Sequence, residues 1–181
     1  MSSNKVLLHA CCAPCLTNSI EELIIEGFEP VVYFYNPNIY PEQEYLTRKE
    51  ELILFCQKKD YDFILEEGDA EIWQSLCDPL GSAKEGGKRC AVCFGMRLEK
   101  TAKMAKEKGF DYFCTTLTIS PHKNSKVINE LGEAFCEKYG VGFLERNFKK
   151  NDGFKKSLEI SKNYNLFRQA YCGCQYSIRS I

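Results

Sequence analysis

Residues 6–23, VLLHACCAPCLTNSIEEL, decide the fold class, because a short apolar run passes directly into a stretch with helical spacing. This pattern predicts a buried strand, a tight turn and a helix. The turn holds Cys11, Cys12 and Cys15, where phosphate-binding folds of this kind carry glycines whose N–H groups meet anionic oxygen. Thiolates repel phosphate and bind soft metal ions. The turn therefore predicts metal binding in place of phosphate binding.

The rest of the chain alternates between strand-like and helix-like segments. The expected strands are 5–9, 30–35, 62–65, 111–117 and 141–144, and the expected helices are 16–26, 42–59, 71–76, 90–108, 125–139 and 155–163. This alternation predicts an α/β fold, a doubly wound and mainly parallel sheet of about five strands, in a single domain over 1–181. Ligands of such sheets bind outside the carboxyl ends of the strands, where the cysteine turn lies.

Composition and charge indicate where the protein is located and in what state its cysteines are. The 181 residues carry a net charge of -1, but residues 121–181 hold 11 Lys and Arg against 6 Asp and Glu, which permits a basic face there. No apolar run approaches the roughly 18 residues of a membrane span, and the N-terminus does not resemble a signal peptide. We therefore expect no membrane contact and a cytoplasmic location. The 11 cysteines are then expected to be reduced and metal-binding or catalytic, not disulfide-bonded.

Seven cysteines fall into three groups. Besides the turn, Cys90 and Cys93 are spaced to share one helix face, and Cys172 and Cys174 flank a glycine. The others, Cys56, Cys77, Cys114 and Cys136, are single and are expected to be small buried hydrophobes. Seven thiols exceed one four-ligand zinc site, and they suffice for a four-cysteine iron–sulfur cluster plus a second metal completed by a carboxylate. The division of ligands between two such centres stays open.

Five motifs together carry a family resemblance. They are HACCAPC (9–15), FYNPNI (34–39), EGGKRCAVCFGMRL (85–98), FCTTLTISPHKN (113–124) and FRQAYCGCQYS (167–177). In this order, from about Val6 to Ser177, the chain closely resembles the QueH-type, cobalamin-independent epoxyqueuosine reductases. The resemblance departs at Gly68-Asp69-Ala70-Glu71, where the family pattern usually reads Gly-Asp-Tyr-Asp.

The resemblance implies a function and a set of cofactors. The reaction would be the last step of queuosine synthesis, in which the epoxide on a modified guanine at the tRNA wobble position is reduced to an alkene. The implied cofactors are a [4Fe-4S] cluster and a nearby mononuclear iron, held in a nucleotide alpha-hydrolase (HUP-like) fold. The partners would be tRNA carrying epoxyqueuosine in its anticodon loop and an electron donor that the sequence does not name.

Two residues are the catalytic candidates. Epoxide reduction needs an acid for the leaving oxygen, and His122, in the loop after the fourth expected strand, or a metal-bound water is suited to this. Asp69 is the candidate carboxylate ligand of the second iron, and its alternative role is to cap the helix that follows it.

Substrate contacts are expected from basic, aromatic and amide side chains. The stretch RNFKKNDGFKK (146–156) interleaves Phe148 and Phe154 with lysines, a pattern suited to phosphates and unpaired bases if the rings are exposed. The alternative is a solvated run of charges whose phenylalanines lie in the core. The candidate substrate-binding residues are Asn36, Asn38, Lys123, Asn124, Lys149, Lys150 and Arg168. Asn36 and Asn38 serve equally well as simple turn residues.

Three other functions compete. A tRNA thiolase of the same fold would need a Gly/Ser-rich loop after the first strand, where this chain has cysteines. A zinc-stabilised RNA-binding module would bind zinc without redox chemistry. A thiol–disulfide oxidoreductase using Cys12 and Cys15 would leave the other clustered cysteines without a role.

Overall fold

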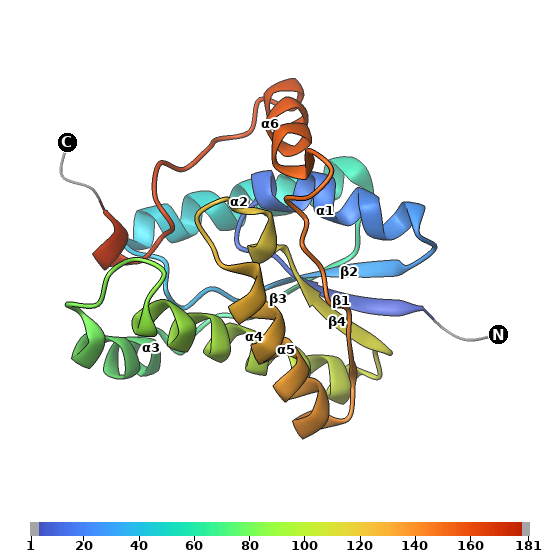
Figure 1. Cartoon of the computed structure of the whole chain (residues 1–181). Coiled ribbons are helices and arrows are strands. Elements are labelled where there is room, and N and C mark those ends of the chain that lie inside the picture. Colours follow the sequence, from blue (N-terminus) through green and yellow to red (C-terminus); the bar gives the residue numbers. More distant parts are fainter. Residues whose placement is uncertain (1–3, 179–181) are drawn as a thin grey trace.

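The computed structural model describes residues 4–178 and contains one five-stranded sheet in the order β3-β2-β1-β4-β5 (Figure 1). The strands are β1 (Lys5–His9), β2 (Glu29–Phe34), β3 (Phe63–Leu65), β4 (Tyr112–Thr115) and β5 (Gly142–Phe143). Every neighbouring pair is parallel. The predicted doubly wound parallel sheet of five strands is therefore confirmed.

Helices cover both faces of the sheet (Figure 1). They are α1 (Ala13–Ile25), α2 (Glu42–Lys59), α3 (Ala70–Cys77), α4 (Lys88–Lys108), α5 (Ser125–Tyr139) and α6 (Gly153–Asn163), with 3-10 turns η1 (Asp78–Leu80), η2 (Thr116–Ile119) and η3 (Gln175–Ser177). Helices α1 and α2 pack on one face, with α6 against α1, while α4 and α5 pack on the other. Within residues 4–178, no helix is long and apolar enough to cross a bilayer.

The central strand β1 shows why both faces need cover. Val6 and Leu8 contribute to the core under α1 and α2, while Leu7 contributes to the core under α4. All three side chains are fully buried. Such a strand reads as continuously apolar, as expected for a parallel sheet with helices on both sides.

Most boundaries differ by one to three residues from those expected, and two of these differences have a local cause. Helix α1 begins at Ala13, not Leu16, because Pro14 occupies its first turn, where the missing N–H costs no hydrogen bond. The fourth strand ends at Thr115, not Leu117. There the Thr115 hydroxyl accepts a hydrogen bond from the Leu117 amide (3.2 Å), which turns the chain into η2.

The sheet order places the site. Strands β1 and β4 are neighbours, and the connections after them lead to opposite faces, which leaves a crevice at their carboxyl ends. The segment after α6 returns across this edge and ends near α3 (Figure 1). There Tyr176 packs against Trp73 and donates a hydrogen bond to Asp78.

Candidate metal centre and active site

Three thiols converge at the end of β1. Cys11, Cys12 and Cys15 place their sulfurs within 4.8 Å of one another, and the sulfurs of Cys11 and Cys12 are 3.8 Å apart. Cys12 is the N-cap of α1 and Cys15 lies in its first turn. The positive end of the helix dipole favours negative charge at this position.

The three thiols shift one another's pKa values in opposite directions. Hydrogen bonds from Cys12 and Cys15, with the charges of Lys123 and Arg97, hold the pKa of the Cys11 thiol well below its ordinary value. Burial, with the hydrogen bond to Cys11, raises the pKa of Cys12 to about 12. Hydrogen bonding to Cys11 and Cys12 raises the pKa of Cys15. In the metal-free turn, these hydrogen bonds and charges therefore favour ionisation of Cys11 over that of Cys12 and Cys15.

Four further thiols lie beside this turn. Cys90 and Cys93 sit in the first turns of α4, and Gly86 N–H donates to the Cys90 sulfur (3.2 Å). Cys93 packs against Cys174 in a small buried cluster. Burial raises the pKa of Cys93, and negative charge on Cys172 and Cys174 raises it further.

The glycine between the last two cysteines shapes their segment. Gly173 has a φ of +128°, a region that strongly favours glycine. This conformation lets the chain turn sharply between Cys172, which lines the pocket described below, and Cys174, which is buried.

The four single cysteines separate into two kinds. Cys56 and Cys114 are buried in the core under α1 and α2, and Cys136 packs at the edge of the other core. Cys77 is also fully buried, but its neighbours include Cys93 and Cys174. Cys77 is thus the one member of this group that shares its packing with the candidate metal ligands.

Two cations face the thiols, Arg97, which is buried, and Lys123, which is half-buried. Arg97, 1% exposed, donates to the Cys93 carbonyl (3.2 Å) and sulfur (3.3 Å). Burial alone would lower the pKa of Lys123, but negative charge on Cys172, Cys11 and Cys15 raises it. Among residues 4–178, neither cation forms an ion pair with a carboxylate.

This arrangement tests whether the residues fit a metal cofactor. A buried cation without a counter-charge is costly, so the surroundings of Arg97 require negative charge. The thiols are the groups that can supply it, and as thiolates they can bind a metal. Soft sulfur donors are those that zinc and iron–sulfur clusters use. The donor set therefore fits a metal or iron–sulfur cofactor.

A pocket of about 220 Å³ opens onto this cluster. Cys11, Cys15 and Cys172 line its floor side, and other lining residues are His122, Lys123, Phe154, Arg168 and Glu85. The pocket thus places two predicted substrate residues and the predicted acid beside three predicted metal ligands. Glu85, which the sequence did not single out, is a carboxylate that lines it.

His9 has a structural role. Its Nε2 lies 3.1 Å from the Tyr35 carbonyl and its Nδ1 lies 2.9 Å from the Thr115 hydroxyl. A carbonyl only accepts, so Nε2 carries the proton and Nδ1 accepts from Thr115. Burial, with the nearby charge of Arg97, lowers the pKa of His9 to about 4. The ring is therefore a neutral brace between β1, β4 and the end of β2.

Asp69 lies in a different polar cluster. Its carboxylate accepts hydrogen bonds from Tyr35 (2.8 Å) and Lys100 (3.3 Å). The Tyr35 hydrogen bond, followed by that of Lys100, lowers the pKa of Asp69. It occupies the N-cap position of α3 without a side-chain capping bond, and it does not line the pocket.

Two of the three candidate asparagines have structural partners. Asn36 and Asn38 are buried, and Asn36 donates to the Ala10 carbonyl (2.9 Å). Both Oδ1 atoms are buried without a hydrogen bond. Asn124 is exposed and caps α5 by accepting from the Lys126 amide (3.0 Å).

The basic stretch 146–156 does not present one surface. Lys149 donates to the carbonyls of Ser120 (3.4 Å) and Lys123 (2.7 Å), and so holds the loop after β4. Lys150 lines a separate groove along α5. The expectation of two exposed aromatic rings was wrong for Phe148, which is 1% exposed and belongs to the core, whereas Phe154 lines the pocket beside Arg168.

Three functional side chains were missed in the sequence. Arg48 and Arg97 are buried, and Gln169 donates to the Cys12 sulfur. A signal for the arginines was present. Arg48 lies on the same helical stripe as Leu52 and Phe55, and Arg97 follows Phe94 by three residues. A charge on an apolar helix face indicates a buried partner.

The fold and the site together define a class: α/β proteins with a doubly wound parallel sheet and a thiol-rich candidate metal site in the turn after the first strand. A family model described as "Epoxyqueuosine reductase QueH" matches residues 6–180. The chain therefore belongs to the epoxyqueuosine reductase QueH family.

Relatives support this assignment over nearly the whole length. The chain is 41% identical over 179 residues to epoxyqueuosine reductase QueH of Acinetobacter baylyi, covering 98% of this chain and 82% of that protein. It is 36% identical over 176 residues to the protein of the same name from Thermotoga maritima, covering 96% and 90%.

Solved structures show the same fold. A U34-tRNA thiolase NcsA from Methanococcus maripaludis with its [4Fe-4S] cluster has a TM-score of 0.59 at 12% identity, covering 98% of this chain and 63% of that chain. A predicted subunit of a tRNA methyltransferase from Methanocaldococcus jannaschii has a TM-score of 0.56 at 13% identity, covering 87% and 74%.

Proposed function

We propose that this chain reduces the epoxide of epoxyqueuosine in tRNA to the alkene of queuosine. Membership of the reductase family makes it an oxidoreductase that acts on tRNA. The observation that carries the proposal is the cluster of Cys11, Cys12 and Cys15 at the sheet's switch point, which is faced by two cations and opens onto a pocket. Such a cluster is suited to redox chemistry at a substrate site.

The chemistry sets the requirements. Conversion of an epoxide to an alkene consumes two electrons and two protons and releases one water. A [4Fe-4S] cluster with an adjacent iron supplies electrons singly and polarises the epoxide oxygen when it is bound. Four of the seven clustered thiols would hold the cluster. The remaining thiols would hold the iron, with Asp69 as its carboxylate in exchange for the hydrogen bonds that Asp69 accepts from Tyr35 and Lys100.

Protons must reach the leaving oxygen in the same pocket. His122 and Glu85 line that pocket and are the proton donors that we propose. The ammonium of Lys123, which also lines the pocket, would stabilise negative charge developing on the oxygen. These groups lie on the loop after β4 and on the segment before α4, opposite the cysteine turn.

The rim of the pocket is suited to an anticodon loop. The guanidinium of Arg168 lies 5.5 Å from the centre of the Phe154 ring, and both residues line the pocket. In such a pair the cation can bind a phosphate while the aromatic ring stacks on an unpaired base. We therefore propose that the modified base enters the pocket with its backbone along Arg168.

The test is an anaerobic reductase assay with tRNA bearing epoxyqueuosine, using dithionite in place of the unidentified electron donor. Nucleosides from the digested tRNA are measured by mass spectrometry. We expect the iron-loaded protein to yield queuosine, Cys15→Ser to yield none, and the core variant Cys56→Ala to remain active. Protein that binds zinc without sulfide, binds tRNA and leaves the epoxide intact would instead establish the zinc-stabilised RNA-binding module.

A further inference from the structure

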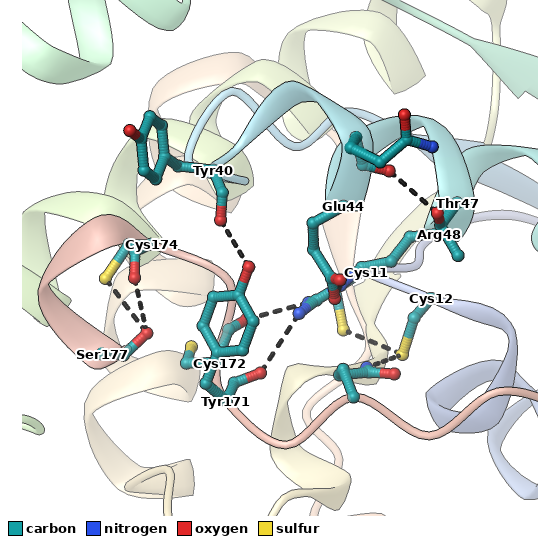
Figure 2. Close-up of polar contacts among 12 residues, drawn as sticks. Cys11, Cys12, Tyr40, Glu44, Thr47, Arg48, Tyr171, Cys172, Cys174 and Ser177 are labelled. Atoms are coloured by element: carbon teal, nitrogen blue, oxygen red, sulfur yellow. Dashed lines mark hydrogen bonds and ion pairs between the residues drawn. The ribbon is translucent and has the colours of Figure 1, made fainter. Parts of the chain in front are cut away.

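Arg48 is a buried charge that does not touch the pocket. It lies on α2 and is 1% exposed. Its guanidinium donates to the carbonyls of Cys172 (3.0 Å) and Tyr171 (3.2 Å), and its Nε donates to Glu44 (2.7 Å). Figure 2 shows this fork reaching from α2 to the segment that carries the C-terminal cysteines. The contact joins residues more than 120 positions apart.

The two carbonyls belong to a segment without regular structure. Residues 166–172 form no helix or strand, so their backbone groups need partners from elsewhere. The guanidinium presents a planar set of donors that matches two successive carbonyls, which a lysine ammonium does not. Glu44 compensates the charge and orients the fork. The N–H groups of Arg48 thus bond the carbonyls of this segment and the carboxylate of Glu44.

Further contacts around Arg48 act on the same segment. The Tyr171 ring lies 5.4 Å from the guanidinium carbon, and its hydroxyl donates to the Tyr40 carbonyl. The Tyr40 amide donates to the Gly173 carbonyl (2.8 Å). The start of α2 and the C-terminal segment are therefore locked together by backbone and side-chain bonds around one arginine (Figure 2).

Arg48 also faces the cysteine turn. Burial lowers the pKa of Arg48, but negative charge on Cys12 and the bond to Glu44 raise it above its ordinary value. In Figure 2 the Arg48 side chain lies between the labelled pair Cys11 and Cys12 and the backbone of Cys172. One cation thus links the N-terminal and the C-terminal halves of the thiol cluster.

We infer that Arg48 is a positioning residue that holds Cys172 and Cys174 against the cysteine turn after β1, so that both halves can bind one metal cofactor. The inference rests on the proposed function, because it assumes that both halves hold the same cofactor. Arg48 makes no contact with the pocket and is not a catalytic residue.

Gly173 provides an independent way to disturb the same clamp. A Cβ at this position would lie 3.0 Å from Nη1 of Arg48 and 3.4 Å from Nδ2 of Asn38. The φ of +128° adds strain for any other residue. Gly173→Ala should therefore loosen the segment while leaving the arginine in place.

The test measures thiol labelling in reduced, metal-free protein. A maleimide is reacted under native conditions, and the modified peptides are quantified by mass spectrometry. We expect Arg48→Gln and Gly173→Ala to raise the labelling rates of Cys172 and Cys174 by about tenfold. This is the size of effect expected when the charged hydrogen bonds that hold the segment are lost or weakened. Cys56 reports global unfolding and should label at the wild-type rate. Lys58→Gln, which removes a charge from the exposed end of α2, is the matched control and should change neither.

A second readout concerns the loaded protein. After anaerobic reconstitution, Arg48→Gln should bind iron about 10- to 100-fold more weakly than the wild type. Arg48→Lys should not restore wild-type iron binding. The labelling experiment needs neither metal nor activity, so it separates the two proposals. If the variants label faster at Cys172 and Cys174 but the wild-type protein has no reductase activity, the proposed function is wrong and the inference about Arg48 stands. Unchanged labelling of Cys172 in both variants, or equal acceleration of Cys56 and Cys172, would overturn the inference.

Discussion

The side-chain amide nitrogen of Gln169 lies 2.6 Å from the sulfur of Cys12, across 157 positions of sequence. An amide N–H can only donate to this sulfur, so the contact favours the thiolate form. The Oε1 atom of the same side chain is buried without a hydrogen bond. Gln169 thus directs its donor at a candidate metal ligand while lining the pocket.

This contact predicts a redox effect. Hydrogen bonds to cluster sulfurs stabilise the more negative, reduced state, so Gln169→Leu should shift the midpoint potential of a bound cluster to a more negative value. The measurement is an anaerobic redox titration followed by EPR. Gln175→Leu is the matched control, because the amide of Gln175 bonds Asp78 instead of a cysteine. An identical potential in Gln169→Leu and wild type would show that the amide does not tune the cluster.

Arg168 tests where the tRNA binds. If this guanidinium contacts a phosphate at the pocket, Arg168→Ala should weaken binding of an anticodon stem-loop and reduce the salt slope by about 1. Lys103→Ala removes an exposed charge from α4 and should leave both quantities unchanged. Fluorescence anisotropy over a series of salt concentrations measures both. Equal effects of the two variants would place the tRNA elsewhere.

His9 predicts a pH-dependent stability in the metal-free protein. Its folded pKa of about 4 lies below the ordinary 6.5, so the unfolded chain binds more protons between these values. The free energy of unfolding should therefore fall as the pH falls, by about 2 kcal/mol between pH 7.5 and 5 from this residue. Urea unfolding at each pH measures the slope. His9→Gln should remove this part, and an unchanged slope would contradict the neutral buried ring.

Two helix glycines predict opposite stability changes. A Cβ on Gly132 of α5 would overlap the ring of Phe143, so Gly132→Ala should lower the free energy of unfolding by about 1–3 kcal/mol. A Cβ on Gly95 of α4 meets only a Leu131 methyl group, at 3.9 Å. Gly95→Ala should therefore raise stability by about 0.5–1 kcal/mol. Urea unfolding compares them, and unchanged stability of Gly132→Ala would contradict the close packing of α5 on β5.

The sheet was predictable because its signals are local. The apolar run of β1 and the helical spacing of α4 fixed the alternation of elements, and alternation implies a parallel sheet. The start of α1 was placed three residues too late, at Leu16, where the helical spacing of apolar residues begins. Proline is, however, compatible with the first turn of a helix.

The site was predictable only in its ligands. Cysteines grouped by sequence spacing indicated metal binding, and the structure brings three of them within 4.8 Å. The partners of these thiols could not be read in the same way, because Arg48 and Gln169 reach them across more than 120 positions. Phe148 was misplaced because its alternation with lysines resembles an exposed surface, while its ring packs in the core.

The most direct test of the central claim is metal and sulfide analysis of anaerobically purified protein, together with its visible spectrum. A four-iron cluster and a separate iron predict about five iron and four sulfide per chain. Serine substitution at each of the seven clustered cysteines should lower the iron content, whereas Cys56→Ala and Cys114→Ala should retain it. Stoichiometric zinc without sulfide, or full iron content in the Cys15→Ser and Cys172→Ser variants, would contradict the account.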